Sequence, residues 1–401
     1  MIPKESQTMP LCAWPWLSIL LALLTCIQDG NAQWILSGNE AKIDLDSGAP
    51  VVVATQETDS ISLLDFSVFP PRVQHFMDIP NTVIGPPSNI AISPDGQRVI
   101  IANSLKLDPT ASSGWVPANK AHLMGLSEDG LKPMGQIQTG LQPSGASFTP
   151  DGRYALIANR ADGSITVLEW PTMPGGQMGQ AVSRGEVEVC PPEESLSDVA
   201  IAPDGSLVLA SVQQGGYLAE LHLVDGQLAP SGRKYSVYGQ PYRVVISPDG
   251  RYGITAGAGS GDPLDPDALT LIDLKASTPV VVDHITLDPV TESLEISPDG
   301  KWIAAVCMAG SNLPPGDPHR SDHGSLVILK RDRKGFSVSQ RLPTGRIPEG
   351  VAFTADGRYI AVQCHPAREI WIYRLRGSRF RDTGHRVVTP GFPSSMRAVI
   401  P

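Results

Sequence analysis

The clearest pattern of hydrophobic and polar positions spans residues 148–170, with the sequence FTPDGRYALIANRADGSITVLEW. Short apolar runs at 154–158 and 165–170 are rich in residues that favour strands. A Pro-Asp-Gly turn at 150–152 and an Asp-Gly pair at 162–163 separate these runs, as tight turns do between antiparallel strands. The segment therefore predicts three strands joined by two tight turns.

The same pattern returns along the chain at regular intervals. Successive Asp residues of the turns are 56, 53, 45, 50 and 57 positions apart. Strand-rich repeats of this length are typical of propeller blades, and one repeat cannot bury both faces of its sheet unless it stacks on its neighbours. The further turns are Pro94-Asp95-Gly96, Pro203-Asp204-Gly205, Pro248-Asp249-Gly250, Pro298-Asp299-Gly300 and the variant Ala355-Asp356-Gly357.

The two ends of the repeat region complement each other. A strand with alternating apolar residues precedes each turn, and residues 391–401 resemble that strand without the rest of its blade. Residues 51–66 match the later strands of the repeat. We therefore predict an all-β, seven-bladed propeller of four-stranded antiparallel blades, closed by one blade shared between the N- and C-termini. Such closure removes the open sheet edges.

The repeat also resembles a known family. An SPDG or TPDG turn, a short strand ending in Ala-Asn and a following apolar strand resemble the YVTN-type β-propeller repeat, best at 148–168 and next at 92–104. The resemblance covers nearly all of the chain after the N-terminal segment. It is similar to the seven-bladed lactonase-like (6-phosphogluconolactonase-like) and surface-layer propellers. It implies the architecture but little about function, because that superfamily includes both sugar-lactone hydrolases and proteins with no assigned chemistry.

Residues 1–32 have the features of a signal peptide. Lys4 precedes an apolar run at 17–27, and small residues at 30–32 suit cleavage before Gln33. The run is too short for a comfortable membrane span. We expect a secreted or periplasmic protein with one propeller domain at 33–401, and an uncleaved N-terminal anchor is the alternative.

Charge and cysteine content narrow the class of partner. The net charge is −10, and it becomes −9 without residues 1–32. Such a chain has no long-range attraction for nucleic acid, so we expect none as a partner.

Three cysteines, Cys190, Cys307 and Cys364, remain once residues 1–32 are set aside, and their spacing is not that of a disulfide framework. We expect packing to hold a monomer together.

Loop lengths indicate which face carries a site. In an up-and-down blade, the connection between the first and second strands lies on one face, and the connection between the second and third lies on the other. The Pro-Asp-Gly turns belong to the first kind. Three long insertions, at 104–120, 257–267 and 308–324, belong to the second. Because long loops in a compact repeat usually serve function, we predict a pocket among them for a small molecule or a protein partner.

Polar residues also stand at the strand starts nearest the predicted axis. A buried charge must be paired or face a wet channel, so these residues predict either a ligand site or a ring of ion pairs between blades. They are Asn89, Asp198, Arg243, Glu292 and Glu349, with Glu295 and Arg397 one step deeper.

Two sets of residues suggest chemistry. A lactonase-like hydrolase, acting on a sugar lactone or related ester, would use His365, Arg243 and Glu349 as base, anion holder and acid. The chain has no recognised catalytic motif, so a binding propeller and this hydrolase stay open as alternatives. We expect no cofactor; the alternative is a divalent metal in the 308–324 insertion. Its ligands would be His319, His323 and Asp317, although the spacing is not specific without a helix.

Overall fold

The computed structural model describes Met1 and residues 33–400, except residues 54, 56, 82–83, 175–177 and 260–262. The predicted signal peptide, apart from Met1, lies outside the described residues. The chain divides into a unit of residues 1–30 and a unit of residues 31–401, and all described strands belong to the second unit.

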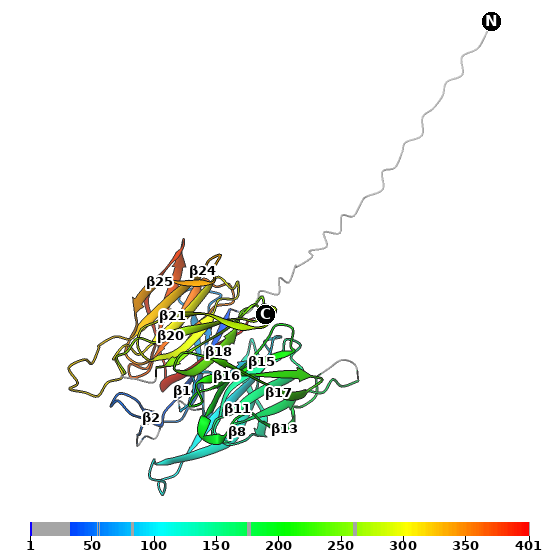
Figure 1. The fold of residues 1–401 in the computed structure, drawn as a ribbon, viewed down its shortest axis with the longest axis horizontal. Helices are drawn as coiled ribbons and strands as arrows, with labels where there is room; N and C mark the ends of the chain where they lie inside the picture. The colour runs from blue at the N-terminus through cyan, green and yellow to red at the C-terminus, as the bar shows by residue number, and fades with distance from the viewer. Residues whose placement is uncertain are drawn as a thin grey trace. The chain divides into compact units, whose positions relative to one another are not determined.

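Seven antiparallel sheets of four strands, each a blade, build this unit (Figure 1). From the axis outward, blade 1 is β6 (Ile90–Ile92), β7 (Arg98–Leu107), β8 (Trp115–Ser127) and β9 (Gly130–Gln138). Blade 2 is β10 (Pro143–Phe148), β11 (Tyr154–Asn159), β12 (Ser164–Glu169) and β13 (Val182–Glu188), and blade 3 is β14 (Leu196–Ile201), β15 (Leu207–Val212), β16 (Tyr217–Val224) and β17 (Gln227–Ser236). Blade 4 is β18 (Gln240–Ile246), β19 (Tyr252–Ala258), β20 (Ala268–Asp273) and β21 (Val280–Thr286), and blade 5 is β22 (Thr291–Ile296), β23 (Trp302–Cys307), β24 (Ser325–Arg331) and β25 (Phe336–Pro343). Blade 6 is β26 (Pro348–Phe353), β27 (Tyr359–Cys364), β28 (Glu369–Arg376) and β29 (Arg379–Val388), and blade 7 is β30 (Phe392–Ala398), β1 (Trp34–Glu40), β4 (Ser60–Asp65) and β5 (Arg72–Met77). A two-stranded sheet, β2 (Ile43–Asp44) with β3 (Val51–Val52), and one 3₁₀ turn at Pro192–Glu194 complete the described elements.

The seventh blade confirms the predicted closure between the two ends of the chain. Strand β30 pairs with β1, with Leu36 opposite Arg397, and β1 pairs with β4, with Leu36 opposite Leu63. The predicted boundary 51–66 is wrong in part: residues 60–65 belong to this blade, whereas Val51–Val52 pairs with β2 in the small sheet. Strand β1, which supplies the blade's second strand, was not predicted from the sequence.

The Pro-Asp-Gly turns join first and second strands as predicted. At the second blade, the Thr149 hydroxyl donates to the Asp151 carboxylate at 2.5 Å, and the Gly152 amide donates to the Thr149 carbonyl at 2.8 Å. Gly152 has a φ of 66°, which a side chain would disfavour. Ser or Thr makes the same contact with the turn Asp at positions 93, 247, 297 and 354.

The core lies between adjacent blades rather than within one sheet. Blades 5 and 6 share one apolar cluster, in which the rings of Trp302 and Phe380 meet edge to face at 5.6 Å. Each such side chain contributes about 1.5–3 kcal/mol when fully buried. Neighbouring blades are therefore the unit of stability, as expected for a closed ring of repeats.

The three predicted insertions differ in form. Residues 104–120 are not an open loop: β7 and β8 continue outward as a long hairpin, with Leu105 opposite Pro117 and Leu107 opposite Trp115. The strands extend because Leu105 packs with Ile43 and Trp115 in a small apolar cluster. Residues 308–324 do form a loop between β23 and β24, and 257–267 connects β19 to β20 with its middle outside the described residues.

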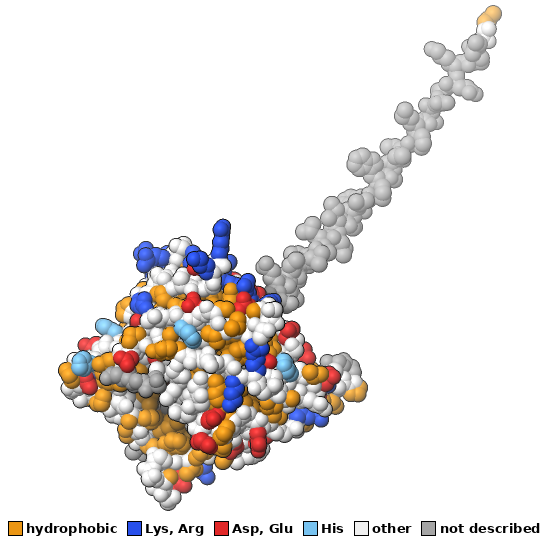
Figure 2. Space-filling view, viewed as in Figure 1, with side chains coloured by type: hydrophobic (Ala, Val, Ile, Leu, Met, Phe, Trp, Pro, Cys, Tyr) orange, Lys and Arg blue, Asp and Glu red, His pale blue; other side chains and the backbone are white. Residues whose placement is uncertain are grey.

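The side chains of the face in view are mixed in charge. Figure 2 shows acidic and basic residues interspersed, with Lys and Arg gathered at the upper edge over the ends of β24–β25 and β28–β29. In the β28–β29 hairpin, Arg374 lies opposite Arg381 and Arg376 lies opposite Arg379. Among the described residues, no helix has the length and apolar character needed to cross a membrane.

Candidate functional site: an axial cavity with two carboxyl groups

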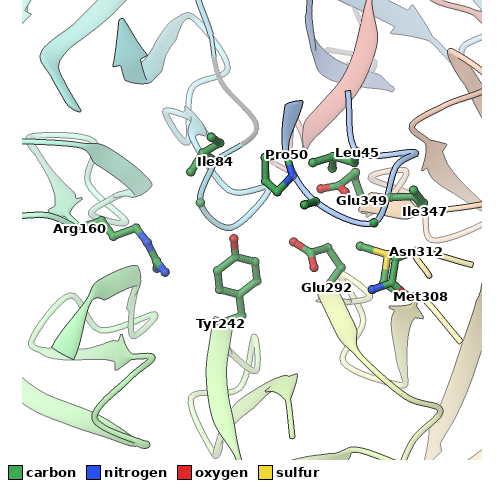
Figure 3. Close-up of a pocket in the computed structure, with 13 residues that line it drawn as sticks. Leu45, Pro50, Ile84, Arg160, Tyr242, Glu292, Met308, Asn312, Ile347 and Glu349 are labelled. Carbon is green, nitrogen blue, oxygen red and sulfur yellow. The ribbon is translucent and has the colours of Figure 1, made fainter. Parts of the chain in front are cut away.

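A cavity of about 240 Å³ opens where several blades meet, on the face opposite the Pro-Asp-Gly turns (Figure 3). Its walls come from five blades (1, 2, 4, 5 and 6) and from the β2–β3 hairpin, so it lies at the axis of the ring. The polar lining residues are Arg160, Tyr242, Glu292, Asn312 and Glu349, and the remaining ones are Leu45, Gly48, Ala49, Pro50, Ile84, Gly85, Met308 and Ile347.

A β-bulge places each of the three central polar side chains. In β18, β22 and β26, the register shifts at Tyr242, at Glu292 and at Glu349–Gly350, so the innermost strand has one residue more than its neighbour. A bulge turns the extra side chain out of the regular alternation, here toward the axis. In blades 2, 3 and 7 the bulge holds the small residues Ser144–Gly145, Ser197 and Ser394. The cavity therefore has its large polar groups along one side.

The two carboxyl groups are held in an environment that favours their neutral form. Burial raises the pKa of Glu292 to about 7, against a smaller opposing effect of Arg160. Burial and the neighbouring Glu292 raise the pKa of Glu349 well above its usual range. Glu349 is 1% exposed, and its Oε1 has no hydrogen-bond partner among the described residues. A buried carboxyl oxygen without a partner is costly unless a ligand satisfies it.

Arg160 and Tyr242 form the opposite end of the polar wall. The Arg160 guanidinium donates to the Ser197 hydroxyl and to the side-chain oxygen of Gln213, which fixes its direction. It lies 5.8 Å from the centre of the Tyr242 ring. Burial raises the pKa of Tyr242 well above its usual value, so its hydroxyl stays protonated. Figure 3 shows Tyr242 beside Glu292, with Arg160 on the far side of the ring.

A second cluster of charged side chains lies deeper in the same innermost strands. Arg243 contacts Asp198 at 3.3 Å and Glu295 at 2.8 Å, and Arg397 contacts Glu295 at 3.4 Å. The Val244 amide also donates to Asp198 at 3.1 Å. These four side chains, Asp198, Arg243, Glu295 and Arg397, are called the ion cluster. Each of its two carboxylates contacts an arginine, as in one of the two arrangements considered for the polar residues near the axis.

Packing is close beside Asp198 of the ion cluster. A Cβ atom on Gly145 would lie 2.0 Å from a carboxylate oxygen of Asp198, so any other residue there would displace the buried carboxylate. Asn89, predicted as a ligand residue, is 1% exposed and donates to the Ala102 carbonyl at 2.8 Å. It joins two strands of blade 1 and does not line the cavity.

The structure does not bring His365, Arg243 and Glu349 together. Only Glu349 lines the cavity, whereas Arg243 is held in the ion cluster. His365 is fully buried and stacks on Phe392 with ring centres 4.8 Å apart. Burial lowers the pKa of His365 to about 3, with the Pro393 and Ile43 carbonyls opposing the shift. The three side chains therefore do not form one catalytic site, because each has different surroundings: the cavity, the ion cluster and a buried stack on Phe392.

The 308–324 loop does not gather the expected metal ligands. His319 Nδ1 lies 3.5 Å from Asp317, and the His323 amide bonds the Ser321 hydroxyl. Among the described residues, no three His, Cys, Asp or Glu side chains are grouped so that they could hold a metal ion.

Several lining residues were missed from the sequence. Tyr242 occupies the bulge position that Ser197 occupies in blade 3, so an aromatic residue in a series otherwise made of Ser, Gly and Glu was a usable signal. Arg160 directly follows β11 in the repeat 148–168, and no residue beside it in the sequence marked it as part of a site. Leu45–Pro50 belong to the connection between the second and third strands of blade 7, which was not recognised as an insertion because β1 was not predicted.

Comparison with known proteins supports the fold and leaves the chemistry open. No family model and no curated protein matches the sequence, so the YVTN resemblance stays a prediction. A Bacteroides fragilis protein provisionally assigned as a 6-phosphogluconolactonase has a TM-score of 0.67 at 15% identity, over 92% of this chain and 98% of that one. The periplasmic gluconolactonase of Pseudomonas aeruginosa has a TM-score of 0.63 at 17% identity, over 91% and 98%. Hydrazine synthase of Kuenenia stuttgartiensis has a TM-score of 0.60 at 21% identity, over 79% and 90%.

These similarities show a seven-bladed propeller whose structural neighbours include lactonase-like proteins. At such low identity they show the fold alone, and the neighbours differ in the chemistry that their names state. Function must therefore be argued from the cavity.

Proposed function

We propose that this propeller binds a small polar molecule in the axial cavity. One observation carries the proposal: the carboxyl group of Glu349 is almost fully buried, lines the cavity and leaves Oε1 without a partner among the described residues. Such burial is tolerated only where another interaction compensates for it. The cavity volume suits a molecule of monosaccharide size and is too small for a protein segment, so a small ligand is favoured over a protein partner.

A panel of sugars, sugar lactones and sugar acids, followed by thermal unfolding, tests this proposal. A ligand present at 100 times its Kd stabilises the folded state by about 2.7 kcal/mol, which is easily measured. Glu349→Gln should abolish or strongly reduce the shift. Glu128→Gln, in the exposed turn between β8 and β9, is the matched control and should keep it. No shift with any member of the panel would contradict the proposal.

The second candidate function is hydrolysis of a sugar lactone or related ester. Glu292 supports it, because a carboxyl group with a pKa of about 7 is poised to accept a proton from water near neutral pH. Protonated Glu349 would then serve as the acid, and Arg160 would stabilise the negative charge that develops on the carbonyl oxygen. These residues take the roles first expected of His365, Arg243 and Glu349.

An assay with D-glucono-1,5-lactone separates the two candidates. If the chain is a hydrolase, Glu292→Gln should lower kcat by about 10²–10⁴-fold, as loss of a general base does. The pH–rate profile should rise with an apparent pKa near that of Glu292. Binding without turnover would retain the binding function and discard the hydrolase.

Export of the chain completes the proposal. Its support is the apolar run and the small residues within 1–32, together with a structural neighbour named as periplasmic. Mass spectrometry of the protein recovered from its native compartment should find Gln33 as the first residue. An intact N-terminus in a membrane fraction would favour the anchored alternative.

A further inference from the structure

The hairpin between β1 and β4 is an addition to the propeller rather than part of a blade. Its ladder consists of two residue pairs, Ile43 with Val52 and Asp44 with Val51. Its turn supplies Leu45, Gly48, Ala49 and Pro50 to the cavity wall. Residues 43–52 are called the strap. In Figure 3 the strap passes beside the mouth of the cavity, with Pro50 and Leu45 near Glu349.

One side chain joins the strap to the opposite wall. The Asp46 carboxylate accepts a hydrogen bond from Arg346 at 3.1 Å and forms an ion pair with the same guanidinium at 2.6 Å. Arg320 contacts the same carboxylate at 2.7 Å and donates to the Asp46 carbonyl at 3.1 Å. Arg320 also donates to the Leu313 carbonyl at 2.8 Å, which fixes it within the 308–324 loop. Asp46 therefore joins the strap to two segments that lie 274 and 300 positions later in the chain.

The other contacts of the strap are weaker or lie near its base. Ile43 and Val52 pack with Leu105 in a small apolar cluster, and Lys42 binds Asp59 at the start of the strap. At the turn, Gly48 touches Pro314 so closely that a Cβ would lie 2.9 Å from its ring. Asp46 is thus the strongly bonded group of the turn. An ion pair with two arginines is stronger and more directional than a single exposed pair.

We propose that Asp46, held between Arg320 and Arg346, is a positioning residue that latches the strap over the axial cavity and limits which molecules enter. The inference rests on the proposed function, because the strap matters only if the cavity takes a ligand. With the latch closed, the strap bounds one side of the cavity and sets the size of its ligand. When the latch opens, the strap turns about its two-pair ladder and the cavity becomes accessible to larger molecules.

A cysteine placed in the cavity wall reports on the latch without any ligand. Met308→Cys and, as a second reporter, Asn312→Cys each put a thiol on the wall beneath the strap. Both are made with Cys190→Ser, because Cys190 is partly exposed, whereas Cys307 and Cys364 are buried. The measurement is the rate of modification by a small and by a bulky maleimide under native conditions.

Opening of the latch should increase that rate. In Asp46→Asn, we expect modification of either reporter to be about tenfold faster, with the larger increase for the bulky reagent. The double variant Arg320→Gln/Arg346→Gln should match it. Asp382→Asn breaks a similarly exposed carboxylate–arginine pair, with Arg386 at 2.6 Å on blade 6, and should leave the rate unchanged. Raising the salt concentration should also speed modification of the parent reporter, because Asp46 is 33% exposed.

Two outcomes would overturn the latch. An unchanged rate in Asp46→Asn for both reporters means that the strap does not control access. An equal increase in Asp382→Asn means that general loosening, not the latch, exposes the thiol. The result is independent of the proposed function, because modification needs no ligand. A strap that opens as expected over a cavity that binds no panel member would retain the latch and discard the binding proposal.

Discussion

The cavity and the ion cluster lie in the same innermost strands and contain the same kinds of side chain. Arg243 follows Tyr242 directly, and Glu295 lies three residues after Glu292. In the ion cluster every carboxylate contacts an arginine. In the cavity, Glu349 lies beside Glu292 and has no arginine contact within the described part of the chain. Asp198 of the ion cluster, like Glu349, has one oxygen without a hydrogen-bond partner among the described residues and a pKa raised by burial, so the arginine contact is what differs. The difference separates a buried charge that holds blades together from one that is kept for another molecule.

The bulge explains how neighbouring residues reach such different surroundings. A residue in the bulge projects toward the open end of the axis, whereas Arg243, the next residue of β18, contacts Asp198 of blade 3 and Glu295 of blade 5 deeper along it. Each innermost strand can therefore contribute one side chain to a site and the next to the packing. Substitutions in the ion cluster and in the cavity test this difference, and they are given from the largest expected effect to the smallest.

Arg243→Met should destabilise the protein severely. It removes the cation that contacts both Asp198 and Glu295 and leaves Asp198 as a buried charge without its arginine. Loss of one partner of a buried ion pair costs about 3–5 kcal/mol. Chemical denaturation measures the change. A loss below about 1 kcal/mol would mean that the ion cluster is not structural.

Stability should depend on pH through Glu292. Its folded pKa of about 7 lies above the unfolded value near 4.5, so the folded state holds the proton more tightly. Stability is then highest below pH 4.5 and falls as pH rises to about 7, by roughly 3 kcal/mol in total. Because His365 and other groups titrate in the same range, the quantity to measure is the difference between wild type and Glu292→Gln at each pH. A flat difference would contradict the prediction.

Glu349→Gln should act in the opposite direction to Arg243→Met. The amide needs no protonation to remain buried, so the folded state should gain about 1–2 kcal/mol at pH 7 while ligand binding is lost. Opposite signs for two buried charged residues would support the distinction between site and scaffold. If Glu349→Gln is destabilising and leaves binding intact, Glu349 belongs to the scaffold instead.

Tyr242→Phe should have the smallest effect on the fold. It removes one hydroxyl that lies near the Gly85 amide, which corresponds to about 0.5–1.5 kcal/mol of stability. The ring continues to pack against Arg160, so the cavity wall is preserved. Calorimetry should find weaker ligand binding with a nearly unchanged melting temperature. Unchanged affinity would place the ligand away from Tyr242.

Local signals were sufficient for the architecture. The Pro-Asp-Gly turns require a positive φ at glycines such as Gly152, and alternating apolar residues beside them specify short strands. Those signals repeat, so blade number and the shared closing blade could be inferred. The error at residues 51–53 arose because Val51 and Val52 favour a strand equally well in a blade and in the small β2–β3 sheet.

The site was predictable only in part. Glu292 and Glu349, which line the cavity, were singled out because a buried charge near the axis must be paired or face water. Their separation from Arg243, Asp198 and Glu295 was not predictable, because a one-residue bulge leaves no signature in the hydrophobic pattern.

By itself, the sequence determined a ring of seven strand repeats, because turn chemistry and apolar alternation act between near neighbours in the chain. Only the tertiary structure decided which polar residues face the cavity and which pair in the ion cluster. That choice depends on depth along the axis, and depth depends on bulges and on contacts between blades. The strap shows the same principle, since Asp46 meets Arg320 and Arg346, which lie 274 and 300 positions later in the chain.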